Sequence, residues 1–273
     1  MEAAKIMPAL STGFELILNA CESTLQIGVT HDEEPLCFQQ WHIPKQATEI
    51  LAPALASIFD NLHLKPAKIR RIACVNGPGS FTGIRLVLAT AAALSRVNKA
   101  QLAAINYMQA LATSLAMRAA LSYGTKIYVL TRARRDLVHF QEFVSFSMQI
   151  PAQAIMGVML VKPSIALKSI EPVNSYVCGS ALGQYPELFE PVRTGEGPKG
   201  APNARVFPEL VNPDWAALRL LARHGDYFHR DLEPFYVRQC DALENVERLA
   251  GQGGMTGEEL LDRLDEILNR KPD

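Results

Sequence analysis

One stretch decides the predicted fold: Asn76-Gly77-Pro78-Gly79-Ser80-Phe81-Thr82-Gly83-Ile84-Arg85. The residues before it, Ile69 to Val75, end in an apolar run that indicates a buried strand. The residues after it, Gly83 to Val97, are rich in helix formers and apolar on most sides. The stretch is therefore expected to form a sharp turn from a core strand into a buried helix.

The residues of this turn allow two interpretations. Glycines permit backbone angles that a β-carbon would penalise, and Ser80 or Thr82 can cap the helix. Free amides at a helix N-terminus can also hold a phosphate or carboxylate. The residues predicted to form an anion- or nucleotide-contacting loop are Gly77, Gly79, Ser80, Thr82 and Gly83. Because the spacing fits neither G-x-x-x-x-G-K-[ST] nor G-x-G-x-x-G, a capped turn without a ligand is an equally good interpretation.

Composition narrows the class of protein. The 273 residues, 48% hydrophobic and 20% charged, can bury a full core. A formal net charge of −1 gives no chain-wide basic surface for nucleic acid, so a partner would supply most contacts to any RNA. The five cysteines are scattered and the histidines lack an H-E-x-x-H pattern, so we expect no metal site and a reducing cytoplasm. No run of about 18 apolar residues occurs, and no membrane span is expected.

Hydrophobic patterning predicts an α/β fold, because strands alternate with helices. In the first half, the expected strands and helices are Phe14–Asn19, Leu25–Val29, Pro35–Trp41, Thr48–Leu62 (helix), Ile69–Val75, Gly83–Val97 (helix), Ala103–Asn106 and Tyr107–Leu121 (helix). In the second half they are Ile127–Leu130, Leu137–Phe146, Tyr176–Ala181 and Asp214–Arg223 (helix). Val192 to Phe207 is rich in glycine and proline and is expected to be a connector. No internal repeat is evident.

The string Gly77 to Arg85, followed by an alanine-rich helix, resembles the TsaB family, also called YeaZ. Glu233 to Arg238 is similar to the P-x-Y-x-R end of that family. The resemblance is weak through residues 144–211. It implies a two-lobed sugar-kinase or actin-like (ribonuclease H-like) fold with mixed sheets flanked by helices. The lobes would be residues 14–121 and 122–238, followed by a charged helical tail, 239–273, outside the resemblance.

The resemblance also implies a function. TsaB proteins are non-catalytic partners of TsaD, which transfers threonylcarbamoyl from threonylcarbamoyl-AMP to adenosine 37 of tRNAs that read ANN codons. A TsaE-like ATPase joins the complex, and tRNA contact by this chain would be indirect. No tightly bound cofactor is implied, and ATP or ADP would bind only at a subunit junction. Whether the isolated chain forms a homodimer stays open.

Three departures from the family pattern affect these expectations. Asn19 stands where relatives carry an aspartate for phosphate and metal, and an amide has no charge for Mg²⁺. Glu22 is a shifted carboxylate that we interpret as a turn residue. Ala47 replaces a histidine that is frequent in the family. Arg132 to Leu137 keeps one arginine of the family hairpin, Arg134, but loses its acidic residues and glycine, leaving a small basic turn.

The implied contact surface for TsaD consists of two helices of the first lobe. Its predicted residues are Ile50, Leu51, Ala54, Leu55, Ile84, Val87, Leu88, Ala91 and Leu94. A helix that is apolar all round must be covered on both sides, so one face would pack on its own sheet and the other on a partner. Val87→Glu or Ala91→Arg is therefore expected to abolish pairing and leave the fold intact.

Two other functions remain in view on the same fold. An ATP-dependent phosphotransferase or ATPase would need metal-binding carboxylates where Asn19 and Arg132 stand. A stand-alone peptidase would need a nucleophile with its base or a metal triad, and neither pattern is present in the sequence. The preferred interpretation is a non-catalytic subunit.

Overall fold

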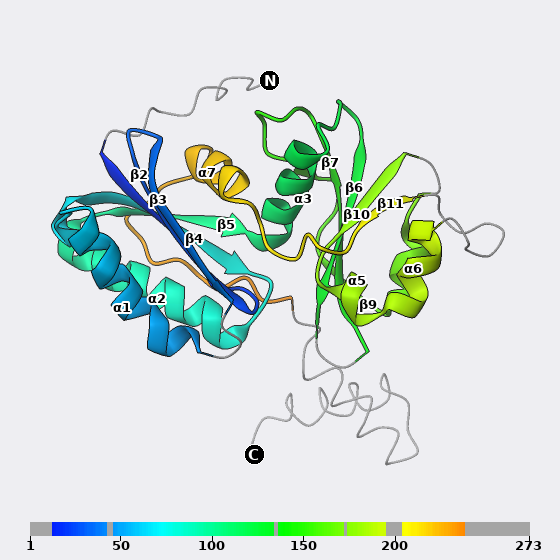
Figure 1. Ribbon diagram of the computed structural model, residues 1–273, viewed down its shortest axis with the longest axis horizontal. Helices are drawn as coiled ribbons and strands as arrows, with labels where there is room; N and C mark the ends of the chain where they lie inside the picture. The colour runs from blue at the N-terminus through cyan, green and yellow to red at the C-terminus, as the bar shows by residue number, and fades with distance from the viewer. Residues whose placement is uncertain (1–12, 43–45, 134–135, 172–173, 195–203, 238–273) are drawn as a thin grey trace, which may run out of the picture. The chain divides into compact units, whose positions relative to one another are not determined.

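The computed structural model describes residues 13–42, 46–133, 136–171, 174–194 and 204–237 (Figure 1). Its first sheet has the strand order β3-β2-β1-β4-β5. The strands are β1 (Phe14–Asn19), β2 (Thr24–His31), β3 (Glu34–His42), β4 (Ile69–Gly77) and β5 (Gln101–Asn106). β1 to β3 form an antiparallel meander, whereas β4 and β5 run parallel to β1. The core strands of this sheet are buried almost throughout, as their apolar runs predict.

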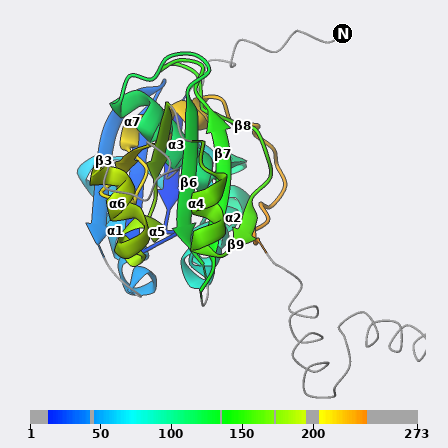
Figure 2. The ribbon, with the colours of Figure 1, turned by 90° about the vertical axis from the view of Figure 1, so that its right-hand side faces the viewer.

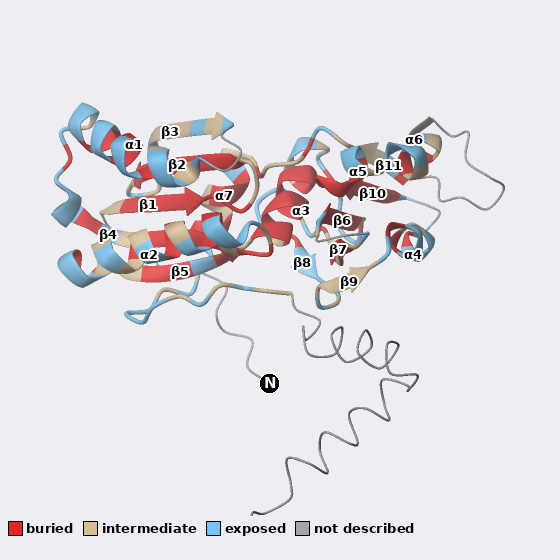
Figure 3. Ribbon diagram, turned by 90° about the horizontal axis from the view of Figure 1, so that it is seen from below, coloured by how far each residue is buried: buried red, intermediate tan, exposed pale blue. Residues whose placement is uncertain are grey.

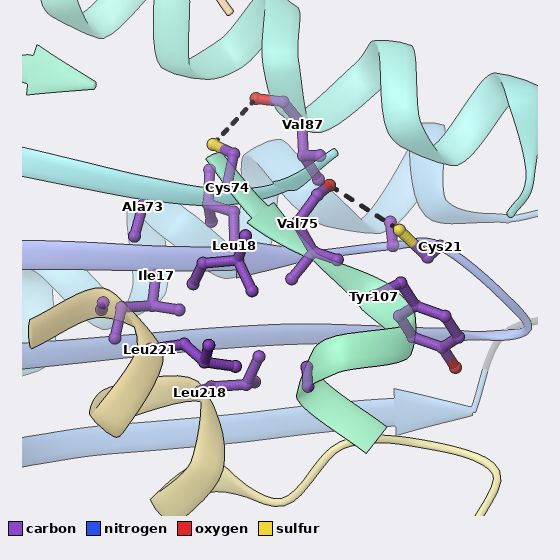
Figure 4. Close-up of a cluster of buried hydrophobic side chains, with 14 of the residues drawn as sticks. Ile17, Leu18, Cys21, Ala73, Cys74, Val75, Val87, Tyr107, Leu218 and Leu221 are labelled. Atoms are coloured by element: carbon purple, nitrogen blue, oxygen red, sulfur yellow. Dashed lines mark hydrogen bonds between the residues drawn. The ribbon is translucent and has the colours of Figure 1, made fainter. Parts of the chain in front are cut away.

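Helices cover both faces of the first sheet. On one side lie α1 (Ala47–Asn61) and α2 (Phe81–Asn98), with the short 3₁₀ helix η1 (Pro66–Lys68) leading into β4. On the other side lies α7 (Trp215–Arg223), which contacts β1 and β5. In the close-up of the core, Val87 of α2 and Leu218 and Leu221 of α7 approach the strands from opposite sides (Figure 4).

The second sheet has the order β11-β10-β6-β7-β8, with β9 also paired to β7. Its strands are β6 (Lys126–Arg132), β7 (Val138–Val144), β8 (Gln153–Ala154), β9 (Met159–Val161), β10 (Ser175–Cys178) and β11 (Ala204–Phe207). Its helices are α3 (Tyr107–Arg118) on one face and α4 (Pro163–Ser169), α5 (Ala181–Gln184) and α6 (Pro186–Thr194) on the other. Figure 2 shows the second group in front of the strands.

The two sheets share one topology. In each, an antiparallel hairpin is followed by parallel strands on the other side of its first strand, β4 and β5 in one sheet and β10 and β11 in the other. The helix after each last strand then packs on the opposite sheet: α3 follows β5 and contacts β6, while α7 follows β11 and contacts β1. The expected two-lobed, actin-like α/β fold is confirmed, and it contains a topological repeat that the sequence does not reveal (Figure 1).

Residues 208–236 return to the first lobe. The indole ring of Trp215 packs against Gly28 of β2, where an added β-carbon would come within 2.2 Å of the ring. The same indole stacks on Phe38 of β3, with ring centroids 5.0 Å apart. Further on, Phe228 and Leu102 exchange backbone hydrogen bonds at the β5 edge. The second sheet thus ends at β11, which differs from the predicted lobe 122–238, and the predicted tail 239–273 lies outside the described residues.

The connector expected over Val192 to Phe207 is shorter in the structure. α6 continues to Thr194, and Ala204 to Phe207 forms β11 beside β10. The four-residue strand β11 was not predicted, because a strand that short shows little periodicity and because glycines and prolines precede it. The same reason explains why β8, β9 and α5 were not predicted.

Candidate functional site

The loop from β4 into α2 is built as the sequence predicts. Ser80 is the N-cap of α2, and its hydroxyl accepts a hydrogen bond from the amide of Gly83 at 3.3 Å. The amide of Ser80 donates to the carbonyl of Cys21 at 2.5 Å. Thr82 is exposed in the first turn. Three polar groups of the predicted anion loop, the Ser80 hydroxyl and the amides of Ser80 and Gly83, are therefore used to hold the loop together and to bind it to the turn after β1.

The loop glycines have a steric explanation. A β-carbon on Gly79 would lie 2.1 Å from the carbonyl oxygen of Cys21, and one on Gly83 would lie 1.9 Å from that of Ala20. Gly77 has φ +127°, and a β-carbon there would come within 2.4 Å of the carbonyl oxygen of Phe235. Close backbone approach thus requires all three glycines. Anion binding by this loop stays a prediction.

The two sequence stretches that carry the family resemblance lie against each other. The amide of Phe235 donates to the carbonyl of Asn76 at 2.7 Å. The guanidinium of Arg85 covers the ring of Phe81 at 3.7 Å, and its Nε donates to the hydroxyl of Tyr236 at 2.9 Å. Phe81 and Tyr236 also stack, with centroids 5.4 Å apart. The end of the described chain therefore stabilises the entry to α2, which no local signal in the sequence predicted.

Asn19, the position of the missing aspartate, has a structural role. The residue is 1% exposed, its Nδ2 donates to Oε1 of Gln26 at 2.7 Å, and its Oδ1 accepts from the amide of Cys21 at 3.0 Å. Gln26 in turn donates to the carbonyl of Pro213 and to Gln40, both at 2.8 Å. The amide of Asn19 thus organises the β1–β2 turn and connects it to the segment before α7.

Glu22 is more than a turn residue. Its carboxylate accepts a hydrogen bond of 2.5 Å from the hydroxyl of Ser180, which belongs to the turn between β10 and α5 in the other lobe. Burial raises the pKa of Glu22 to about 7, against the opposing effects of the Ser180 hydrogen bond and the positive charge of Arg132. Of the predicted basic turn, Arg134 and Arg135 lie outside the described residues, and Arg132 is exposed.

Most of the predicted interface residues face the core of their own lobe. Leu51, Ala54, Leu55, Ile84, Val87, Leu88 and Ala91 are all buried, and Ile50 and Leu94 are partly buried. Both helices also have exposed positions (Figure 3). Some of these are small, namely Ala52, Pro53 and Ala56 on α1 and Ala89 and Ala93 on α2, and others are charged or large, among them Glu49, Arg85, Arg96 and Val97. If these helices meet a partner, the exposed positions provide the contact, and the buried ones support the helices from below. Ala47 is partly buried at the start of α1.

The cysteines within the described residues are free thiols. Cys21 donates to the carbonyl of Val75 at 3.7 Å and Cys74 to that of Val87 at 3.9 Å (Figure 4). Burial raises the pKa of both thiols, which keeps them neutral. Within the described part of the chain, no group of three or more His, Cys, Asp or Glu side chains is placed to hold a metal ion.

A cavity of about 700 Å³ lies at the β5 edge, where the sequence predicted none. Its walls come from the carboxyl ends of β4 and β5, the loop before β8, and the segment after α7. The lining mixes apolar side chains such as Ile105 and Leu221 with the ionisable His224, Asp226 and Glu233.

Among the described helices, none is long and apolar enough to cross a membrane.

Known proteins share this architecture. The family model described as TsaD, tRNA N6-adenosine threonylcarbamoyltransferase, matches residues 43–177. A crystal structure of an uncharacterized Pseudomonas aeruginosa protein with similarity to peptidase YeaZ superposes with a TM-score of 0.67 at 17% identity, covering 83% of this chain and all of the other.

YeaZ from Pseudomonas aeruginosa superposes with a TM-score of 0.65 at 16% identity, covering 82% of this chain and all of that one. No curated protein is significantly similar in sequence. The chain is thus a YeaZ-like protein in fold, and about half of it matches the TsaD family model.

Proposed function

We propose that this chain is a non-catalytic partner of a TsaD-like transferase, which it scaffolds and activates by heterodimerisation for threonylcarbamoylation of adenosine 37 in tRNAs that read ANN codons. The YeaZ-like fold and the match to the TsaD family model support this proposal. A TsaE-like ATPase completes the complex, and the transferase supplies the contacts to tRNA. ATP or ADP would bind only where subunits meet.

The observation that carries the proposal is that the side chain of Asn19 is used for hydrogen bonds within the protein. In two-lobed kinases and ATPases of this fold, the turn after the first strand normally carries an aspartate for phosphate and metal, and Mg²⁺ prefers carboxylate oxygens. Here that turn offers an amide whose two polar atoms are bonded to Gln26 and Cys21. Each polar atom of this buried side chain already has a hydrogen-bond partner within the protein, and the side chain has no negative charge to offer a metal ion. The hydrogen bonding of Asn19 therefore favours a non-catalytic role for this chain over a catalytic one.

The proposed contact surface is the exposed side of α1 and α2. Ala52 and Ala56 lie four residues apart on α1, and Ala89 and Ala93 lie four residues apart on α2, so each pair forms one face of its helix. The two helices are in contact with each other. Small exposed side chains allow the backbone of a partner helix to come close, and no charge on these positions would have to be desolvated.

Light scattering on a sizing column tests the proposal. The chain mixed with the TsaD-like protein of the same organism should give a new species of one copy each. Ala93→Arg should abolish that species, because a guanidinium would be forced into an apolar contact. Ile165→Arg, on the exposed side of α4, is the matched control and should associate like the wild type. If the wild-type chain does not associate with the transferase, the partner role is wrong.

A further inference from the structure

The cavity at the β5 edge lies where a strand pairing stops. β5 is the outer strand of the first sheet, and the segment after α7 runs beside it (Figure 3). Leu102 of β5 donates its amide to the carbonyl of Phe228 at 2.7 Å and accepts from the amide of Phe228 at 2.9 Å. This antiparallel bridge is isolated, so the two segments diverge beyond it. Residues of both segments line the cavity of about 700 Å³.

Strand geometry directs the backbone groups of Ala104 toward this cavity. Because the amide and carbonyl of Leu102 point away from β4 toward Phe228, those of Ala104, two residues further along the same strand, point to the same side. Ala104 is exposed and lines the cavity. No described residue forms a hydrogen bond with its amide or carbonyl. The edge therefore offers one backbone donor and one backbone acceptor to which a further strand can add.

The charged side chains around Ala104 are mostly negative. The lining contains three carboxylates and one guanidinium, those of Asp226, Asp231, Glu233 and Arg230. Asp231 is paired with Arg96 at 2.5 Å, whereas Asp226 and Glu233 have no ion-pair partner among the described residues. If the register of the bridge continued, Asp226 would stand opposite Ala104. A positively charged group is therefore attracted to the place where a strand would add.

Two side-chain amides of the cavity also favour a ligand with hydrogen-bond donors. Nδ2 of Asn76 donates to the carbonyl of Glu233 at 3.1 Å, and Nε2 of Gln109 donates to the carbonyl of Ala152 at 2.9 Å. A carbonyl can only accept, so these bonds fix the orientation of both amides. Their oxygens stay available as acceptors, because neither has a hydrogen-bond partner within the described part of the chain.

We propose that this cavity is a docking site for an extended peptide segment with a basic side chain, which adds to the free edge of β5 at Ala104. The peptide backbone exchanges hydrogen bonds with Ala104 as Phe228 does with Leu102, and the lysine or arginine of the peptide lies against Asp226 and Glu233. A volume of about 700 Å³ is within the range of cavities that hold a ligand of this size. The inference does not depend on the partner proposed for α1 and α2.

An NMR titration of the isotope-labelled full-length chain tests the proposal. The probe is a blocked hexapeptide of alternating threonine and arginine, which favours an extended backbone and has its charges on one side. The amide resonance of Ala104 should shift and saturate, because its free N–H gains an acceptor. The same peptide methylated on every backbone nitrogen keeps its charge but cannot donate from its backbone, and it should bind about fivefold or more weakly. Equal binding of the two peptides, or an Ala104 resonance that does not move, would overturn the strand addition.

Variants of the chain give a second test, read by calorimetry. Ala104→Pro removes the outward N–H, whereas the bonds of β5 to β4 come from the neighbouring residues and are kept. It should weaken peptide binding by about fivefold or more, with circular dichroism confirming the fold. The double variant Asp226→Asn with Glu233→Gln should weaken binding to a similar degree at low salt and much less at high salt. Peptide binding by the double variant that equals the wild type at low salt would contradict the proposed role of the two carboxylates.

Two controls identify the kind of ligand. Glu187→Gln, on the exposed first turn of α6, also removes one negative charge and should bind the peptide like the wild type. Agmatine carries a guanidinium and an amine but no peptide group, so it should bind much more weakly than the peptide and leave the Ala104 amide resonance in place. If agmatine binds as tightly as the peptide, the cavity is a site for small organic cations and the peptide proposal is wrong.

Discussion

The α-carbon of Gly79 faces the carbonyl of Cys21 so closely that a β-carbon would lie 2.1 Å from the oxygen. The same pair of segments is held by the hydrogen bond from the Ser80 amide to that carbonyl. The glycine loop and the β1–β2 turn therefore form one packed unit, and the loop conformation depends on a residue far away in the sequence.

Gly79→Ala should consequently destabilise the fold by about 2–3 kcal/mol, because the methyl group must displace backbone rather than a flexible side chain. Urea unfolding followed by circular dichroism measures the loss. Gly183→Ala is the control, since a β-carbon there meets nothing within 4 Å. That change should leave stability the same or slightly higher. Equal stability of the two variants would mean that the β1–β2 turn can shift to accommodate the added methyl group.

Local signals were enough to predict the β4–α2 unit. An apolar strand, two glycines and a serine cap stand in one stretch, and each has a meaning that does not depend on distant residues. The strands of the first sheet and helices α1, α2 and α7 were predicted for the same reason.

Long-range contacts could not be predicted in this way. Glu22 and Ser180 are 158 positions apart, and the sequence around neither residue indicates that the two form a hydrogen bond. The return of residues 208–236 to the first lobe depends on the fit of Trp215 over Gly28, which only the folded chain reveals. An isolated glycine in a strand indicates that another group packs closely against the backbone there, but it does not show which residue does so.

The inward face of α2 was also misjudged from the sequence. Because apolar residues surround the helix, their spacing does not show which side meets the sheet. The structure buries Val87 and Ala91 completely. Val87→Glu and Ala91→Arg, which the sequence suggested as interface probes, would therefore place a charge in the core.

Ala91→Arg should unfold the chain or cost more than about 3 kcal/mol, whereas Ala93→Arg should change stability by less than about 0.5 kcal/mol. The two positions lie on the same helix two residues apart, one buried and one exposed, so helix propensity cancels between them. Thermal unfolding of both variants is the measurement. A stable Ala91→Arg protein would contradict the placement of α2.

Asn19→Asp should destabilise the fold by about 2 kcal/mol at neutral pH, because a carboxylate would face the Oε1 of Gln26 without the donor that the amide provides. Burial would raise the pKa of the new carboxyl above its unfolded value. Its cost should therefore disappear in acid and grow as the pH rises. Urea midpoints at about pH 5 and about pH 8 test this, with the exposed Asn61→Asp as control. A loss that does not depend on pH would argue against burial of the charge.

Tyr227→Phe should weaken the attachment of the returning segment to the first sheet. The Tyr227 hydroxyl donates to the buried carboxyl of Glu15 on β1, and Thr30 donates to the same group at 3.4 Å. Burial raises the pKa of Glu15, so the folded state binds the proton of the Glu15 carboxyl more tightly than the unfolded state does. The free energy of unfolding therefore falls as the pH rises through this raised pKa. The tyrosine hydrogen bond limits that fall because it stabilises the ionised form.

Removal of the hydroxyl should therefore cost about 1 kcal/mol in acid and more than that at alkaline pH, as the buried carboxylate loses its strongest donor. Chemical unfolding across this pH range gives the difference between the wild type and the variant. Glu15→Gln removes the charge, and in that background Tyr227→Phe should have the same small effect at every pH. If the stability difference between the wild type and Tyr227→Phe stays constant with pH while Glu15 is present, the hydroxyl does not support the ionised carboxylate, and the attachment of this segment rests on the packing of Arg71 over the Tyr227 ring at 4.6 Å.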